Sequence, residues 1–123
     1  MTQQEENKKI VMKLLDTTFN KKKIEEASQY LTDRYIQHNP QVPSGKSGFL
    51  QAVPLFFTVF PALSWEMKHI WADGDYVIVH SLYKMGKDMA VVDVFRLKDG
   101  KADEHWDVIQ EIPQKMAHDN GMF

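Results

Sequence analysis

Hydrophobic residues recur every three or four positions in the first half of the chain and every second position in the second half. The first period is that of an α-helix facing a core, and the second is that of a β-strand. Helical spacing covers Thr2–Phe19, Ile24–Leu31 and Ser47–Phe60, and alternation covers Leu63–Ala72, Tyr76–Lys84, Met89–Leu97 and Lys101–Ile112. Helices that precede strands, instead of alternating with them, predict an α+β fold.

The predicted sheet is an antiparallel meander against which the three helices pack. Between the second and third helices, Tyr35–Pro40 (YIQHNP) is predicted to be extended or turned, because Asn39 precedes a proline. A strongly curved sheet of mainly antiparallel (mixed) strands, closed by helices, forms a cone with an apolar mouth. Such a cone commonly encloses a small-molecule site, so we expect a pocket inside it.

The turn at Lys98–Gly100 decides which side chains of the last hairpin meet. If the loop is three residues long, with the glycine left-handed, Asp93 faces His105 and shares a face with Phe95 and Asp107. If only the last two of these turn residues form the loop, the register slips by one residue, and Asp93 and Asp107 lie on opposite faces. We prefer the three-residue loop, and the constellation depends on that choice.

Composition limits the possible partners. The chain of 123 residues fits one domain, residues 1–123, and 43% hydrophobic residues suffice for a single core. A net charge of −2 leaves no basic excess for nucleic acid. The chain has no cysteine, which excludes disulfides and thiolate catalysis. With no signal core and no apolar run of membrane-spanning length, a cytoplasmic protein without membrane contact is expected.

The candidate catalytic residues are Asp107, Asp93 and His38. An apolar lining raises the pKa of a carboxyl group, which suits Asp107 as a base that takes a proton α to a carbonyl. A protonated Asp93 could donate to the developing enolate oxygen, and His38 could donate to the bound carbonyl. Purely structural roles stay open for both acids: Asp107 is capped by a partner on a neighbouring strand, and Asp93 is neutralised by His105 or His80.

The expected ligand contacts come from aromatic and imidazole side chains around these acids: Tyr35, His80, His105, Phe56, Phe60 and Phe95. Histidine and aspartate are competent metal ligands, but no paired histidines occur at helical spacing. We therefore expect neither a metal nor a cofactor.

Several segments resemble one known family. The order of three helices before a strongly bent sheet, the segments YIQHNP and YVIVHSLY, and the ending VVDVFRLKDGKADEHWDVIQ are similar to SnoaL-like polyketide cyclases. These belong to the nuclear transport factor 2-like (cystatin-like) superfamily, with ketosteroid isomerase and limonene epoxide hydrolase as relatives. The resemblance spans nearly the whole chain. It implies that Asp107 is the acid/base of an intramolecular aldol condensation without metal or cofactor, and that Asp93 is a second pocket residue.

The sequence thus predicts a pocket protein for a small apolar carbonyl compound. Its expected activity is cofactor-free acid/base catalysis, either aldol cyclisation or keto–enol isomerisation. A ligand-binding module without turnover and a dimeric interaction module are the alternatives. A homodimer is expected in each case, because a sheet with tryptophan and valine on both faces needs cover on both.

Overall fold

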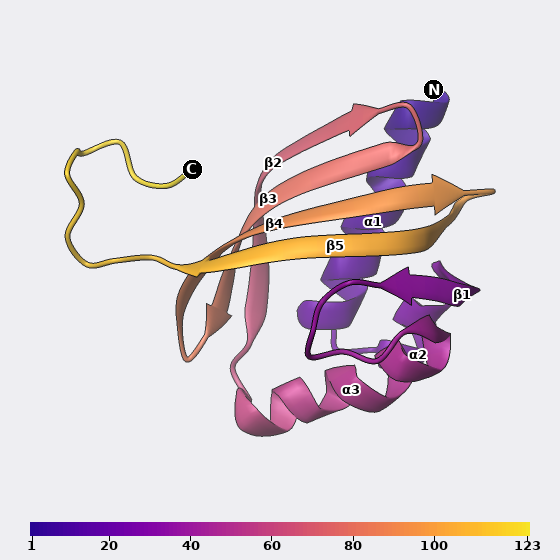
Figure 1. Cartoon of the computed structure of the whole chain (residues 1–123), viewed down its shortest axis with the longest axis horizontal. Helices are drawn as coiled ribbons and strands as arrows, with labels where there is room; N and C mark the ends of the chain where they lie inside the picture. The colour runs from indigo at the N-terminus through magenta and orange to yellow at the C-terminus, as the bar shows by residue number, and fades with distance from the viewer.

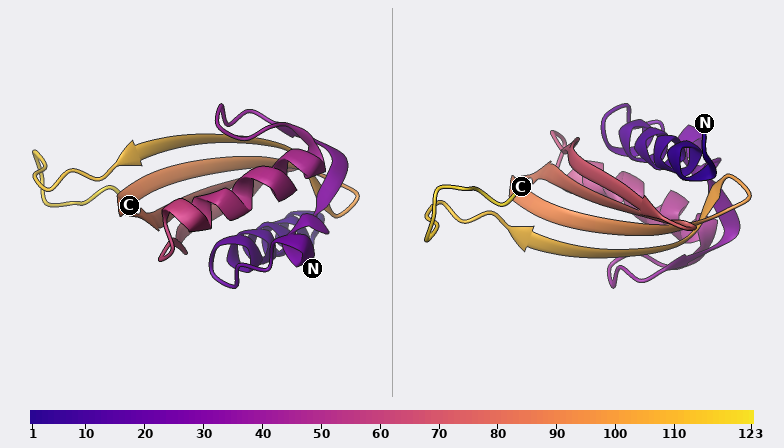
Figure 2. Two further views of the ribbon diagram at one scale, coloured as in Figure 1. Left: turned by 90° about the horizontal axis from the view of Figure 1, so that it is seen from below. Right: turned by 90° about the horizontal axis from the view of Figure 1, so that it is seen from above.

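The helices lie along the concave side of one curved, five-stranded sheet in the computed structural model, which describes all 123 residues (Figures 1 and 2). The elements in chain order are α1 (Gln3–Phe19), α2 (Ile24–Ser28), β1 (Leu31–Gln37), α3 (Gly45–Val59), β2 (Ser64–Asp73), β3 (Tyr76–Met85), β4 (Lys87–Lys98) and β5 (Lys101–Glu111). The strand order is β1-β5-β4-β3-β2. The predicted α+β class is confirmed, and the curved sheet stays open and does not close into a barrel.

Strand β1 is the main addition to the predicted meander. It pairs parallel to β5, whereas all other neighbouring strands are antiparallel, so the sheet is mixed. The second helix ends at Ser28 because the chain enters this strand at Leu31. The pairing register shifts between Leu31 and Ile36, so buried and exposed side chains do not alternate strictly along β1, and the sequence pattern does not predict the strand.

Local signals explain how the first helix begins and what it buries. Thr2 and Glu5 form a reciprocal capping box at its start. Val11, Leu14 and Leu15 point into the core and are almost fully buried. They pack in one cluster with the inward side chains of the sheet and of α3: Val77, Val79, Phe95, Leu97, Phe49 and Val53. Burial of each such side chain stabilises the fold by about 1.5–3 kcal/mol.

The hairpin between β4 and β5 turns through two residues and not three. Asp99 and Gly100 both have positive φ, of 52° and 78°, and Lys98 pairs with Lys101. Two left-handed residues are what a type I′ turn requires, and its twist matches that of the strands. The preference for a three-residue loop was therefore wrong.

A bulge at Asp103 compensates for the shorter turn. Leu97 pairs with Ala102 but Arg96 pairs with Glu104, so Asp103 is an extra residue on β5. Beyond it, Asp93 faces Asp107 and no longer His105, which instead faces Phe95. The predicted partners were wrong, but the predicted common face for these four residues is confirmed.

Side chains from three strands hold the bulge. The Asp103 carboxylate is 1% exposed and accepts hydrogen bonds from Thr32 Oγ1 at 2.7 Å, from Arg34 Nε at 3.0 Å and from Arg96 Nη2 at 2.7 Å. The bonds from Arg34 are the largest influence that holds the pKa of Asp103 well below its usual range. The carboxylate therefore stays ionised and ties β1, β4 and β5 together at the point where the register shifts.

Candidate active site

A cavity of about 110 Å³ opens between the concave face of the sheet and the helices. Thirteen of its twenty lining residues are hydrophobic, and none is lysine or arginine. Its apolar wall includes residues from α1 and α3: Leu14, Leu15, Phe19, Phe49, Val53 and Phe56. Its polar lining comes chiefly from β4, β5 and the segment that leaves β1. This combination of an apolar wall with a few convergent polar groups is typical of a small-molecule site.

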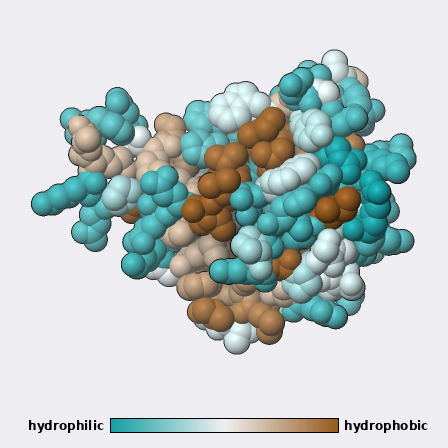
Figure 3. Space-filling view, in the orientation of Figure 1, coloured by the Kyte–Doolittle hydropathy of each residue, from teal (hydrophilic) through white to brown (hydrophobic).

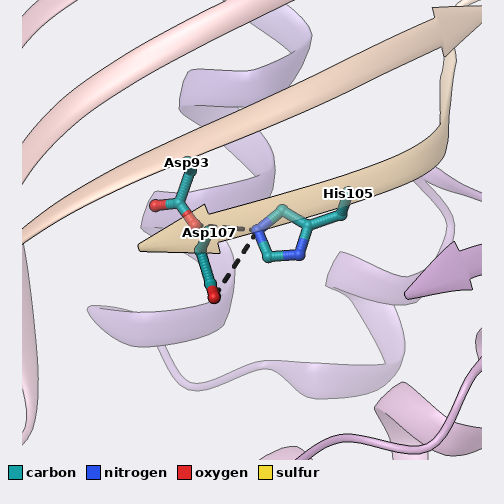
Figure 4. Close-up of side chains that lie close together, drawn as sticks. All are labelled: Asp93, His105 and Asp107. Carbon is teal, nitrogen blue, oxygen red and sulfur yellow. Dashed lines mark hydrogen bonds and ion pairs between the residues drawn. The ribbon is translucent and has the colours of Figure 1, made fainter. Parts of the chain in front are cut away.

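Asp93, His105 and Asp107 form the centre of the polar lining (Figure 4). Asp93 and His105 are 3% and 6% exposed. His105 Nε2 lies 2.8 Å from Asp93 Oδ1 and 3.9 Å from Asp107 Oδ2. Antiparallel pairing brings the two aspartates opposite each other, and the next inward position on β5 adds the imidazole.

The Asp107 carboxylate is held by one amide. Asn39 Nδ2 lies 3.0 Å and 2.9 Å from its two oxygens, and Asn39 Oδ1 accepts the backbone N–H of Gln41 at 2.9 Å. That backbone donor fixes which end of the amide faces Asp107. Burial raises the pKa of Asp107; the bonds from Asn39 and the charge of His105 oppose this, and the charge of Asp93 adds to it.

Two buried tyrosines supply hydroxyl groups beside the acids. Tyr83 donates to Asp93 Oδ2 at 3.0 Å, and Tyr35, which is 3% exposed, stacks on the His105 ring with centroids 6.3 Å apart. Burial is the largest cause that raises the pKa of both phenols. Both hydroxyls therefore keep their protons at neutral pH and can act as hydrogen-bond donors.

The same three residues are the only histidine and carboxylate group in the chain that could share a metal ion. Their donor atoms lie within 4.8 Å of one another. However, His105 and Asp93 already bond each other directly, and no buried side-chain nitrogen or oxygen lacks a hydrogen-bond partner. The three residues therefore form a complete hydrogen-bonded network with their neighbours.

Six of the nine expected site residues line the cavity: Tyr35, Phe56, Asp93, Phe95, His105 and Asp107. His38 does not. It lies beyond the end of β1, its ring stacks on Trp106 with centroids 4.9 Å apart, and its Nε2 lies 2.7 Å from Glu104 Oε2. Trp106 and Glu104 alternate with His105 along β5, so they belong to the outer face of the sheet. The expectation of His38 in the pocket is corrected accordingly.

His80 and Phe60 also lie outside the cavity. His80 pairs with Val92 on the outer face, while its neighbour Val79 pairs with Asp93 on the inner face. The His80 ring packs on Phe123, with centroids 4.9 Å apart, at the end of the C-terminal segment that turns back beyond β5 (Figure 1). Phe60 follows α3, lies near Gly86 between β3 and β4, and packs against the small cluster of Leu63, Tyr83 and Val91.

The sequence interpretation missed Gln37, Asn39 and Tyr83. Gln37 and Asn39 follow Tyr35 at two-residue intervals, so alternation through YIQHNP could have placed all three on the cavity side. Tyr83 shares the inner face of β3 with Val77 and Val79. Alternation along this strand places Tyr83 opposite to His80, but His80 was taken as the residue that faces the pocket, so the inner face was assigned wrongly.

The outer face of the sheet carries several exposed apolar side chains. Trp71, Tyr76 and Val108 are 52%, 42% and 71% exposed. Figure 3 shows apolar side chains gathered over the strands in this view. Face-to-face histidine and tryptophan rings, His69 on Trp71 and His38 on Trp106, flank this surface.

Comparisons with known proteins give the family from a sequence model and the fold from solved structures. A sequence model of the SnoaL-like polyketide cyclases matches residues 9–117. No curated protein matches the chain. A candidate polyketide cyclase from Acidithiobacillus ferrooxidans superposes with a TM-score of 0.77 at 19% identity, covering 89% of this chain and 91% of that one.

Two Streptomyces proteins share the fold at similar distance. TsrD from Streptomyces laurentii has a TM-score of 0.75 at 18% identity, with 89% of this chain and 91% of that one covered. AclR, a candidate hydroxylase from Streptomyces galilaeus, has a TM-score of 0.74 at 20% identity, with 88% and 81% covered. At these identities the likeness establishes the fold alone.

None of the helices of this chain combines the length and the apolar character that crossing a membrane requires.

Proposed function

The chain belongs to the SnoaL-like polyketide cyclase family, and on that premise we propose that its cavity binds a small, mostly apolar carbonyl compound and moves a proton on it without a cofactor. An apolar cavity of about 150 Å³ can take up benzene. The present cavity, of about 110 Å³, is somewhat smaller, so a one-ring ligand would fill it and extend into its mouth. Because no lysine or arginine lines the cavity, a neutral ligand fits better than an anion.

Asp107 is the proposed base. Its carboxylate takes the proton from the carbon α to the carbonyl, the C–H bond breaks, and the electron pair moves onto the carbonyl oxygen as an enolate. The enolate oxygen accepts a hydrogen bond from Tyr35 or from a protonated Asp93. In aldol cyclisation the enolate carbon attacks a second carbonyl, and the oxygen of that carbonyl takes the proton back from Asp107. In keto–enol isomerisation the proton goes instead to the enolate oxygen, which gives the enol.

The observation that carries this proposal is the environment of Asp107. Its side chain is 11% exposed, burial raises its pKa, and Asn39 orients both of its oxygens. A general base works best when its pKa lies near the operating pH, and an upward shift brings a carboxylate closer to that condition. A carboxylate that served only as a structural ion pair would be expected to have a lowered pKa, as Asp103 does.

Proton exchange tests the proposal directly. One-ring ketones such as cyclohexanone and acetophenone are first screened for those that raise the melting temperature, and their α-hydrogens are then followed by NMR in deuterated buffer. We expect the wild type to accelerate exchange and Asp107→Asn to lose this effect by about 10²-fold or more while still binding. Asp88→Asn, an exposed change on β4, is the matched control and keeps wild-type exchange. Binding without any wild-type exchange would instead support a ligand-binding module.

The outer sheet face supports a homodimer as a second element of the proposal. Trp71, Tyr76 and Val108 are large apolar groups exposed on the side away from the helices, where a second copy would cover them. Sedimentation equilibrium is expected to show a dimer in the wild type and a monomer in Trp71→Glu combined with Val108→Lys, with the far-UV circular dichroism unchanged. A monomeric wild type at high micromolar concentration would contradict the dimer and leave the cavity proposal unaffected.

A further inference from the structure

The Gln37 side chain fixes one nitrogen of the His105 ring. Gln37 Oε1 lies 2.7 Å from His105 Nδ1 and also 2.9 Å from the backbone nitrogen of Asn39. A backbone N–H can only donate, so the end of the amide that faces it is the oxygen. The same oxygen can only accept from the ring, and Nδ1 of His105 therefore carries a hydrogen.

The other ring nitrogen faces a carboxyl group. His105 Nε2 lies 2.8 Å from Asp93 Oδ1, with both side chains buried. A neutral imidazole with its hydrogen on Nδ1 presents a lone pair at Nε2, and a lone pair cannot face an ionised carboxylate at this distance. One proton must therefore lie in this bond, either on the ring as imidazolium or on Asp93 as the acid.

We propose that Gln37 is a positioning residue that sets the tautomer of His105, so that His105 and Asp93 together store one proton at the wall of the cavity. Asp107 Oδ2 lies 3.9 Å from the same Nε2 but is held by Asn39 in its own network. The pocket thus contains one proton-bearing pair beside one separate proton acceptor. Resting on the proposed function, this arrangement supplies the donor to the enolate oxygen while Asp107 takes the α-proton.

The other contacts of Asp93 favour a proton that stays in the hydrogen bond between Asp93 and His105. The second oxygen of Asp93 is engaged by the Tyr83 hydroxyl at 3.0 Å. The Tyr83 hydroxyl keeps its own proton, since burial raises its pKa. Gln37 at one end and Tyr83 at the other therefore bound a short chain of hydrogen bonds, and the His105–Asp93 bond lies in its middle.

Nitrogen-15 NMR of histidine-labelled protein tests the tautomer without any substrate, because protonated and bare ring nitrogens resonate far apart. We expect Nδ1 of His105 to stay protonated throughout the neutral pH range in the wild type and in Gln37→Glu, which keeps an acceptor oxygen. In Gln37→Leu we expect the hydrogen to move to Nε2. A bare Nδ1 in the wild type, or an unchanged tautomer in Gln37→Leu, would overturn the proposal. His105→Gln assigns the signal, and substitution of the other four histidines assigns it should that variant not fold.

The exchange assay tests the consequence for activity. With the ketone selected by the melting-temperature screen, Gln37→Leu is expected to lower kcat about tenfold or more with little change in KM, and Gln37→Glu to retain most of kcat. A kcat that is unchanged in Gln37→Leu contradicts a positioning role. A wild type that shows no exchange with any bound ketone disproves the proposed function alone, because the NMR result stands independently of turnover.

Discussion

Asp93 and Asp107 face each other directly across β4 and β5, on the buried face of the sheet. Like charges directly opposite in an antiparallel ladder are destabilising, and more so where water is scarce. The protein offsets this repulsion with separate partners: His105 and Tyr83 bond Asp93, whereas Asn39 bonds Asp107. A pair of acids kept at such a cost in the wall of a cavity is the kind of arrangement found where a site serves chemistry.

The first prediction concerns stability and Asp107. Because burial raises its pKa, the native state binds this proton more tightly than the unfolded chain does. The stabilising effect is fully present below the unfolded pKa of about 4 and is lost as pH rises through the folded pKa. We therefore expect Asp107→Asn to increase the free energy of unfolding at neutral pH by about 0.5–2 kcal/mol.

Urea unfolding of both proteins, in neutral and in mildly acidic buffer, measures this effect. The difference in the free energy of unfolding between Asp107→Asn and the wild type should become smaller in acid, where the wild-type carboxyl is itself protonated. An Asp107→Asn variant that is less stable than the wild type at neutral pH would mean that the ionised carboxylate stabilises the fold, against the inference.

The second prediction concerns the pH profile of proton exchange. A base must be ionised, so the exchange rate should rise with pH through the pKa of Asp107. Asn39→Ala removes two hydrogen bonds that favour the ionised form, each of a kind that contributes about 1.5–3 kcal/mol. We expect the midpoint of the profile to move to higher pH in Asn39→Ala and to stay in place in Asn120→Ala, an exposed control. A midpoint that moves down would contradict the assignment.

The third prediction concerns the carboxylate that holds the bulge. Asp103→Ala leaves Thr32, Arg34 and Arg96 without their common acceptor, and we expect it to lower the free energy of unfolding by about 2–3 kcal/mol at neutral pH. The pKa of Asp103 is lowered in the folded state. Its stabilising effect is therefore present above the unfolded pKa and is lost as pH falls toward the folded value.

Chemical unfolding as a function of pH provides the measurement. The difference in the free energy of unfolding between the wild type and Asp103→Ala should become smaller in acid. Asp33→Ala, which removes a fully exposed carboxylate paired with Lys46, should change stability little and serves as the control. An Asp103→Ala loss no larger than that of Asp33→Ala would show that the bulge needs no such support.

The fourth prediction concerns the contact between α3 and the loop after β1. A Cβ atom on Gly48 would lie 2.0 Å from the carbonyl oxygen of Pro43, which is backbone and cannot simply rotate away. Gly48→Ala should therefore displace the loop that carries Asn39, at a cost of about 1–3 kcal/mol. Thermal unfolding checks the cost, with Ser47→Ala as the exposed neighbour. A Gly48→Ala variant with wild-type stability would show that this loop yields easily.

Sequence periodicity predicted the helices and the meander, because these depend on local spacing. The shared face of Asp93, His105 and Asp107 was predicted from a three-residue turn that the structure does not have, and it is present because the bulge at Asp103 restores the facing that the two-residue turn reverses. Periodicity could not predict that β1 joins the sheet beside β5, since parallel pairing depends on contacts far along the chain. Nor could it tell which face of β3 meets the helices. Ile78 and Leu82 make the outer face of that strand as apolar as the inner one, and so His80 was assigned to the wrong side.

The compensation between the short turn and the extra residue on β5 has a consequence for how this gene can change. Deletion of codon 103 alone would shift the distal half of β5 by one position, which turns Trp106 and Val108 inward and sends His105 and Asp107 to the opposite face. An insertion in the turn made together with that deletion would restore the original facing. A deletion or insertion in this hairpin should therefore be tolerated only together with a second, compensating one. Whether the hairpin has an odd or even number of residues should then stay constant wherever the two acids are kept.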